Sequence, residues 1–131
     1  METKAVLDSD ILIDFINNKN SAVELIKKIS STHNLFTTDI NLFELYYGAY
    51  LSKKTSENIE TIRGLLGTLN FLSTNQNSME EAGKICAELE KKGQRIEITD
   101  ILIGGICLAN SLPIATNNKK HFQRMGIKIL E

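Results

Sequence analysis

The sequence lacks an excess of either charge, any block of like charges and any low-complexity segment. Its 15 Lys and Arg residues stand against 16 Asp and Glu residues, which gives a formal net charge of −1 over 131 residues. This balance excludes a general basic field that would attract nucleic acid, so a polyanion would have to bind a local patch. The absence of charge blocks also argues against a disordered tail.

Long apolar runs and metal-type cysteine spacings are missing as well. The longest apolar run, "ILIGGICLA" at residues 101–109, is well short of the roughly 18 residues that a membrane span needs. The opening "METKAVLD" holds too short an apolar run for a secretory signal. Cys86 and Cys107 form no C-x-x-C pair, which disfavours structural zinc and leaves two reduced thiols packed as small hydrophobes. We therefore expect a cytoplasmic protein without a membrane segment.

What is present is an alternation of short apolar strands with amphipathic helices. Strands are expected at residues 4–7, 34–38, 70–74, 112–116 and 126–130, and helices at 10–18, 21–30, 39–52, 56–69, 78–93, 99–110 and 119–125. This order predicts one α/β domain over residues 1–131, with a mostly parallel sheet flanked by helices. In such folds, sites lie at the carboxyl ends of the strands.

Local signals within these helices predict their ends and one close contact. Ser21, Ser78 and Thr99 are expected to be N-caps, because a serine or threonine side chain can accept a hydrogen bond from the first turn. Gly104 and Gly105 lie inside the helix at 99–110, where each costs about 1 kcal/mol relative to alanine. We therefore expect another backbone to pack closely against them.

Three carboxylates lie where a site would form. Asp8 directly follows the first strand, Glu44 lies on the helix after the second strand, and Asp100 opens the helix at 99–110. A carboxylate near the core needs a partner, a metal ion or a shifted pKa. Each has an ordinary explanation too: Asp100 could simply favour the helix dipole, and Glu44 could be a solvated helix residue.

Taken together, the three acids predict a particular chemistry. Three carboxylates that converge on one cleft repel each other unless a cation is bound. Oxygen ligands without cysteine or histidine suit Mg²⁺ or Mn²⁺ rather than zinc or copper. Hydrolysis of a phosphodiester with bound divalent ions is the reaction that this arrangement fits best.

Three segments resemble the motifs of one family. "VLDSDILIDF" at 6–15, "INLFELYYGA" at 40–49 and "ITDILIGGICLANSLPIATNNKKHF" at 98–122 resemble, in order and at the usual spacing, the motifs of PIN-domain ribonucleases. The resemblance is closest to the VapC-type toxins. It implies a three-layer PIN-like α/β sandwich and an endoribonuclease that depends on Mg²⁺ or Mn²⁺. It also implies an RNA substrate, a VapB-type antitoxin as partner and a homodimer.

The same resemblance assigns the site residues. Asp8, Glu44 and Asp100 match the metal-binding acids of the family, and Asn118 falls on its fourth catalytic position, which is often aspartate. An asparagine offers an oxygen ligand without charge, so three negative charges remain for a pair of ions that carries four positive charges. We expect one ion to be held by the free protein and a second to arrive with the substrate phosphate.

Further residues receive supporting roles. Ser9 and Thr116 match hydroxyl positions of the family and are expected to hold water or phosphate. Asp10 stands where the family usually has asparagine, so we expect it to support the ligands or to cap the first helix. Asp14 is expected to be an ordinary surface residue, because it falls on the polar side of that helix.

The residues after Asn118 suggest a place for RNA. Lys119, Lys120 and Arg124 cluster there, although a solvated helix face explains them equally well. His121 is expected to have a capping or packing role before a packed Phe122.

Three other functions are compatible with parts of the pattern. The Asp8-x-Asp10 spacing resembles that of haloacid-dehalogenase-type phosphatases, but Leu12 and the pair Asn117–Asn118 depart from their motifs. A response-regulator receiver would need an acid where Thr37 and Thr38 end the second strand. A non-catalytic PIN-like interaction module stays open because of Asn118.

Overall fold

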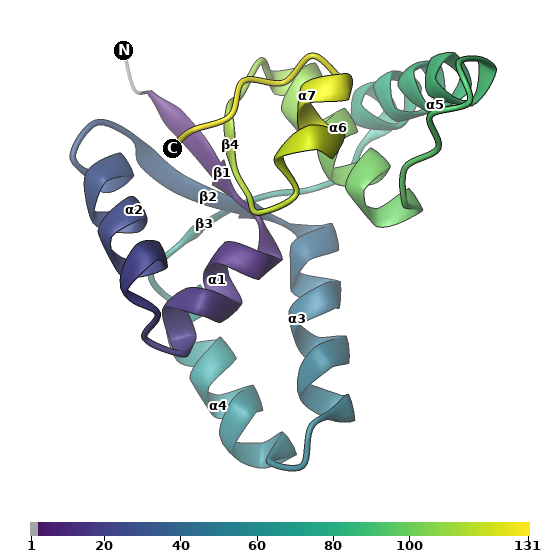
Figure 1. Ribbon diagram of the computed structural model, residues 1–131. Helices are drawn as coiled ribbons and strands as arrows, with labels where there is room; N and C mark the ends of the chain where they lie inside the picture. The colour runs from purple at the N-terminus through teal and green to yellow at the C-terminus, as the bar shows by residue number, and fades with distance from the viewer. Residues whose placement is uncertain (1–2) are drawn as a thin grey trace.

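A four-stranded parallel sheet forms the middle of the molecule (Figure 1). The computed structural model describes residues 3–131. The strands, in the spatial order β3-β2-β1-β4, are β1 (Lys4–Leu7), β2 (Asn34–Thr38), β3 (Asn70–Leu72) and β4 (Ile114–Ala115). Because all pairs are parallel, the carboxyl ends of β1, β2 and β4 lie along one edge of the sheet.

Helices cover both faces of this sheet, which confirms the predicted three-layer α/β sandwich (Figure 1). The helices are α1 (Ser9–Ile16), α2 (Asn20–Ser30), α3 (Asp39–Leu51), α4 (Thr55–Leu66), α5 (Gln76–Lys91), α6 (Ile98–Asn110) and α7 (Lys119–Arg124). One core cluster joins the sheet to α1–α4, and a second joins it to α5–α7. No helix in residues 3–131 combines the length and the apolarity that crossing a membrane requires.

The central strand β1 shows why two layers of helices are needed. Ala5 and Leu7 pack into the cluster on the α1–α4 side, and Val6 packs into the cluster on the α5–α7 side. This alternation follows from the period of two in a β-strand, which sends neighbouring side chains to opposite faces. A strand buried on both faces reads as a continuous apolar run, and here that run ends at Asp8.

The helix starts differ from the predicted N-caps. Neither Ser21 nor Thr99 is an N-cap, since α2 and α6 each begin one residue earlier, and their N-cap positions make no side-chain hydrogen bond. Ser78 is not an N-cap either: Asn75 is the N-cap of α5, and Ser78 is its partner three residues later in a capping box. Each side chain accepts a hydrogen bond from the backbone N–H of the other residue. The N-cap of α5 therefore lies three residues earlier than expected.

The last two predicted strands are shorter than expected. The strand predicted at 112–116 is reduced to Ile114 and Ala115, because the N–H of Leu112 bonds to Cys107 at the end of α6 and Pro113 has no N–H to donate. The segment 126–130 is not a strand. It makes one parallel bridge, Ile114 to Ile129, because β4 is too short to support a longer ladder.

Close packing of α6 confirms the expected backbone contact at Gly105, whereas Gly104 faces the side chain of Met125. A Cβ on Gly105 would overlap the carbonyl oxygen of Ser78 and the side chain of Ala82 on α5, and one on Gly104 would overlap the sulfur of Met125. The backbones of α5 and α6 therefore approach each other where a larger residue would force them apart. This contact fixes the position of α6, and with it that of Asp100.

Candidate metal centre

Asp8 lies at the carboxyl end of β1 and is the N-cap of α1. Its side chain is 2% exposed. Oδ1 accepts hydrogen bonds from the backbone N–H of Ser9 at 2.8 Å and from Nδ2 of Asn41 at 3.0 Å. Oδ2 accepts one from the hydroxyl of Thr116 at 2.6 Å. Asp8 is thus held by three neutral donors and makes no direct ion pair within residues 3–131.

This environment raises the pKa of the Asp8 carboxyl group from 3.8 to about 7. Burial is the largest cause, and the negative charge of Asp10 adds to it. The hydrogen bonds from Thr116 and Ser9 favour the ionised form, but they do not outweigh the burial. The ionised form of Asp8 is therefore disfavoured in the metal-free protein, and a bound cation would stabilise it.

Glu44 reaches the same place from α3. Its Oε1 accepts a hydrogen bond from the hydroxyl of Ser9 at 2.7 Å. The hydroxyl of Ser9 in turn accepts from Nδ2 of Asn41 at 2.8 Å. Asn41 lies three residues before Glu44 on the same helix face, and this spacing is the signal by which the sequence could have shown its role.

Asp100 closes the other side of the site from the first turn of α6, where it is 4% exposed. Its Oδ2 contacts Nδ1 of His121 at 2.7 Å and accepts a longer hydrogen bond from Nδ2 of Asn118 at 3.4 Å. His121 therefore contacts a site acid, which corrects the expectation of a capping or packing role. Phe122, the next residue, is buried as expected.

One chain of hydrogen bonds links the four predicted catalytic positions. The backbone N–H of Asn118 donates to the hydroxyl of Thr116 at 3.0 Å, and this hydroxyl donates to Asp8. The chain runs in the order Glu44, Ser9, Asn41, Asp8, Thr116, Asn118 and Asp100. Residues separated by more than a hundred positions therefore meet at one edge of the sheet, as the parallel topology predicts.

Asp10 and Asp14 are both tied to the loop between β4 and α7. Asp10 accepts from the backbone N–H of Asn117 at 3.1 Å, and Asp14 accepts from Nδ2 of Asn117 at 3.0 Å. Asp14 is thus not the ordinary surface residue that the helical pattern predicts. Oδ1 of Asp10 is buried and has no hydrogen-bond partner within residues 3–131, and burial raises the pKa of this carboxyl group.

The predicted RNA-binding cations differ in their surroundings. Lys119 forms an ion pair with Glu131 at 2.7 Å, so part of its charge is already compensated. Lys120 and Arg124 are exposed on α7, and neither forms an ion pair within the described part of the chain. The patch expected after Asn118 therefore contains two available cations rather than three.

The acids fit a hard cation by chemistry but are not yet arranged around one. No group of three or more His, Cys, Asp or Glu side chains in residues 3–131 is spaced to hold a metal ion. In this arrangement, Glu44 is bonded to Ser9 and Asp100 to His121. The all-oxygen donor set and the buried, unpartnered Oδ1 of Asp10 nevertheless suit Mg²⁺ or Mn²⁺.

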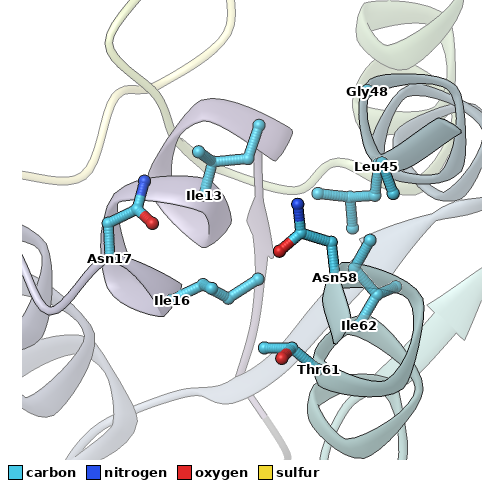
Figure 2. Close-up of a pocket in the computed structure, with 9 residues that line it drawn as sticks. Ile13, Ile16, Asn17, Leu45, Gly48, Asn58, Thr61 and Ile62 are labelled. Atoms are coloured by element: carbon cyan, nitrogen blue, oxygen red, sulfur yellow. The ribbon is translucent and has the colours of Figure 1, made fainter. Parts of the chain in front are cut away.

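An apolar pocket lies between α1, α3 and α4 (Figure 2). Its volume is about 210 Å³. Figure 2 shows Ile16 of α1 extending toward Asn58 and Ile62 of α4, with Leu45 of α3 beside them. Leu45 directly follows Glu44, so the pocket and the acidic site share a helix.

The PIN domain model matches residues 5–128, which is nearly the whole chain. The chain belongs to the PIN domain family. Two curated relatives of this PIN domain are tRNA(fMet)-specific endonucleases VapC, one from Shigella flexneri and one from Salmonella typhimurium. The first is 30% identical and covers 94% of this chain and 92% of its own length. The second is 31% identical and covers 96% of both chains.

A solved structure shows the same PIN fold. VapBC2 from Rickettsia felis, bound to a DNA fragment from their promoter, superimposes with a TM-score of 0.89. It is 26% identical, and the match covers 97% of both chains. The family predicted from the three motifs is thereby confirmed.

Proposed function

We propose that this PIN domain is a VapC-type endoribonuclease that hydrolyses RNA phosphodiester bonds with Mg²⁺ or Mn²⁺. One observation carries the proposal: Asp8, Glu44, Asp100 and Asn118 come from four separate segments and meet in one hydrogen-bonded network at the carboxyl edge of the sheet. The names of its relatives, which are ribonucleases and endonucleases, support the reaction class. The protein would act in the cytoplasm as the toxin of a type II toxin–antitoxin pair.

Asp8, Asp100 and Glu44 are the residues that would hold the cation. A bound divalent ion polarises the phosphate, activates a water molecule and stabilises the leaving oxygen. Oδ1 of Asp8 already accepts two hydrogen bonds, whereas Oδ2 accepts one from Thr116. Since a carboxylate has about four acceptor positions, the position left for the ion is on Oδ2.

The remaining polar residues keep these acids in place. Thr116 fixes Oδ2 of Asp8, and Ser9 fixes one oxygen of Glu44. Asn118 contributes a neutral amide where an acid would add a fourth charge, so the free protein is proposed to bind one ion. The second ion would arrive with the substrate phosphate, whose negative charge replaces that of the missing acid.

The RNA would approach over α7 and the adjoining edge of the sheet. Lys120 and Arg124 are exposed there without ion pairs in residues 3–131, and they would neutralise phosphates next to the scissile bond. Such contacts weaken as the salt concentration rises, because the release of counterions from the RNA then gains less entropy. Cleavage should therefore slow at high ionic strength.

Two protein partners complete the proposal. A VapB-type antitoxin would insert apolar side chains into the pocket between α1, α3 and α4. From there, a basic residue of the antitoxin would reach the acids. A second copy of the chain would cover the exposed apolar face of α3, where Phe43 and Tyr47 stack with ring centroids 5.9 Å apart. Both surfaces are apolar areas that a monomer would leave in contact with water.

A non-catalytic PIN-like interaction module is the second candidate. Asn118 favours it, because the loss of one acid weakens the attraction for a pair of cations. The retention of Asp8, Glu44 and Asp100 within one network favours the nuclease instead.

Cleavage of single-stranded RNA in the presence of Mn²⁺ separates the two candidates. The wild-type protein should cut the RNA, and EDTA, Asp8→Ala or Asp100→Ala should stop it. Asp14→Asn is a matched control, because Asp14 lies on α1 but bonds only to Asn117 and Lys19 in residues 3–131. Equal cleavage by wild type and both alanine variants would refute the assignment.

A further inference from the structure

We propose that Asn41 is a positioning residue, which orients Asp8 and, through Ser9, Glu44. The inference rests on the proposed nuclease function and adds a residue to it. Asn41 is 0% exposed and lies in the first turn of α3, between two predicted metal-binding acids.

The capping box of α3 determines how the Asn41 amide is oriented. Its Oδ1 accepts from the backbone N–H of Thr38 at 3.3 Å and from the Thr38 hydroxyl at 2.7 Å. A backbone N–H is only a donor, so the atom facing it must be the amide oxygen. The amide nitrogen therefore points the other way, toward Asp8.

Both N–H groups of that nitrogen are used within the site. One donates to Oδ1 of Asp8 at 3.0 Å, and the other donates to the Ser9 hydroxyl at 2.8 Å. The Ser9 hydroxyl then donates to Oε1 of Glu44 at 2.7 Å. One side chain thus connects the start of α3 to two acids, one from β1 and one from its own helix.

The hydrogen bond from Asn41 determines which oxygen of Asp8 remains free to bind a cation. With the N–H groups of Ser9 and Asn41 both bonded to Oδ1, the free acceptor position is on Oδ2. Without Asn41, Oδ1 would regain an acceptor position and the carboxylate could rotate. The expected consequence is a weaker and less directed ligand for the cation.

A second capping box in the same chain provides a matched control. In α5, Asn75 is the N-cap and Ser78 occupies the position that Asn41 occupies in α3. Ser78 is 1% exposed, and its side chain bonds only to Asn75 within residues 3–131. The two residues share a place in their helices, but only Asn41 contacts the site.

The test compares Asn41→Ser, Asn41→Ala and Ser78→Ala with the wild-type protein. Asn41→Ser places a serine at the third position of α3, where α5 has Ser78. The capping box of α3 is thus kept, while the hydrogen bond to Asp8 is lost. We expect both Asn41 variants to lower Mn²⁺ affinity by about 10- to 100-fold, and Ser78→Ala to leave it unchanged. Thermal unfolding should show that Asn41→Ser and Ser78→Ala are folded.

A measurement on the metal-free protein makes the result independent of the nuclease assignment. The ¹³C chemical shift of the Asp8 carboxyl group should change in Asn41→Ser and remain the same in Ser78→Ala. An unmoved Asp8 resonance, or a loss of Mn²⁺ affinity in Ser78→Ala as large as in Asn41→Ser, would overturn the role of Asn41. A wild-type protein that neither binds Mn²⁺ nor cuts RNA would instead overturn the proposed function, while the resonance would still decide whether Asn41 orients Asp8.

Discussion

The two sides of the acidic site hold their carboxylates in different ways. On the β1 side, Asp8 is surrounded by neutral donors from a backbone N–H, an amide and a hydroxyl. On the α6 side, Asp100 contacts His121, whose ring carries a positive charge when it is protonated. Both acids are buried, but within residues 3–131 only Asp100 has a group beside it that could supply a counter-charge.

The different surroundings of Asp8 and Asp100 indicate which acid depends more on an added cation. The pKa of Asp8 rises to about 7 because burial and Asp10 oppose its charge, and its hydrogen bonds are too weak to compensate. Asp8 is thus costly to keep ionised in the metal-free protein. Asp8 should therefore gain more from a bound cation than Asp100, although the loss of either acid should stop cleavage.

The largest effect is expected from Asp8→Asn. The amide keeps the size of the side chain but removes the charge that would hold the ion, so RNA cleavage should fall by more than about 100-fold. The measurement is the initial rate of cleavage of a single-stranded RNA in Mn²⁺. Cleavage within a few-fold of wild type would mean that the β1 side is not the centre of the site.

The second prediction concerns the stability of the metal-free protein as the pH changes. The folded-state pKa of Asp8, about 7, lies above its ordinary value of 3.8, so the folded state binds more protons than the unfolded state in this interval. The free energy of unfolding should therefore fall by about 2 to 3 kcal/mol as the pH rises from 5 to 8.

Urea unfolding at pH 5 and pH 8 measures this change. Mn²⁺ at pH 8 should restore part of the lost stability, because it binds only the folded state. Asp8→Asn should flatten the profile, and parallel profiles for this variant and wild type would contradict the account.

A smaller effect is expected from His121→Ala on the α6 side. Loss of one hydrogen bond to Asp100 should lower the cleavage rate by less than about 10-fold, while Mn²⁺ binding persists. Calorimetric titration with Mn²⁺ and the same cleavage assay check this. If His121→Ala were as damaging as Asp8→Asn, the two sides would not differ as proposed.

The smallest effect is expected from Asn117→Ala. The change removes the hydrogen bond to Asp14 but keeps the backbone N–H that bonds to Asp10, and the Asn117 side chain is partly in solvent. Stability should fall by less than about 1 kcal/mol, as measured by thermal unfolding. A large loss would show that the loop between β4 and α7 is held mainly by this side chain.

The sequence predicts the fold well because its strongest signals are periodic. The apolar strands that end at Leu7 and Thr38 and the helices between them follow the expected alternation. Helix starts were predicted less well, since several side chains near a helix start can serve as caps and tertiary contacts choose among them. Ser78, for example, is the partner in a capping box rather than the N-cap.

The sequence assigns candidate site residues only as far as its motifs extend. The resemblance to PIN-domain ribonucleases assigned roles to Asp8, Glu44 and Asp100, and the parallel sheet brings them to one edge. Asn41 and His121 acquire their roles only from contacts between distant segments, to Asp8 and Asp100 respectively. The spacing from Glu44 places Asn41 on the same helix face, but only the structure shows its contact with Asp8. The contact of His121 leaves no such signal in the sequence.

The most direct test of the metal centre is a Mn²⁺ titration of the protein without RNA, followed by electron paramagnetic resonance. We expect one saturable site, which disappears in Asp8→Asn and persists in Asp14→Asn. Two sites of similar affinity in the free protein, or no site at all, would contradict this expectation.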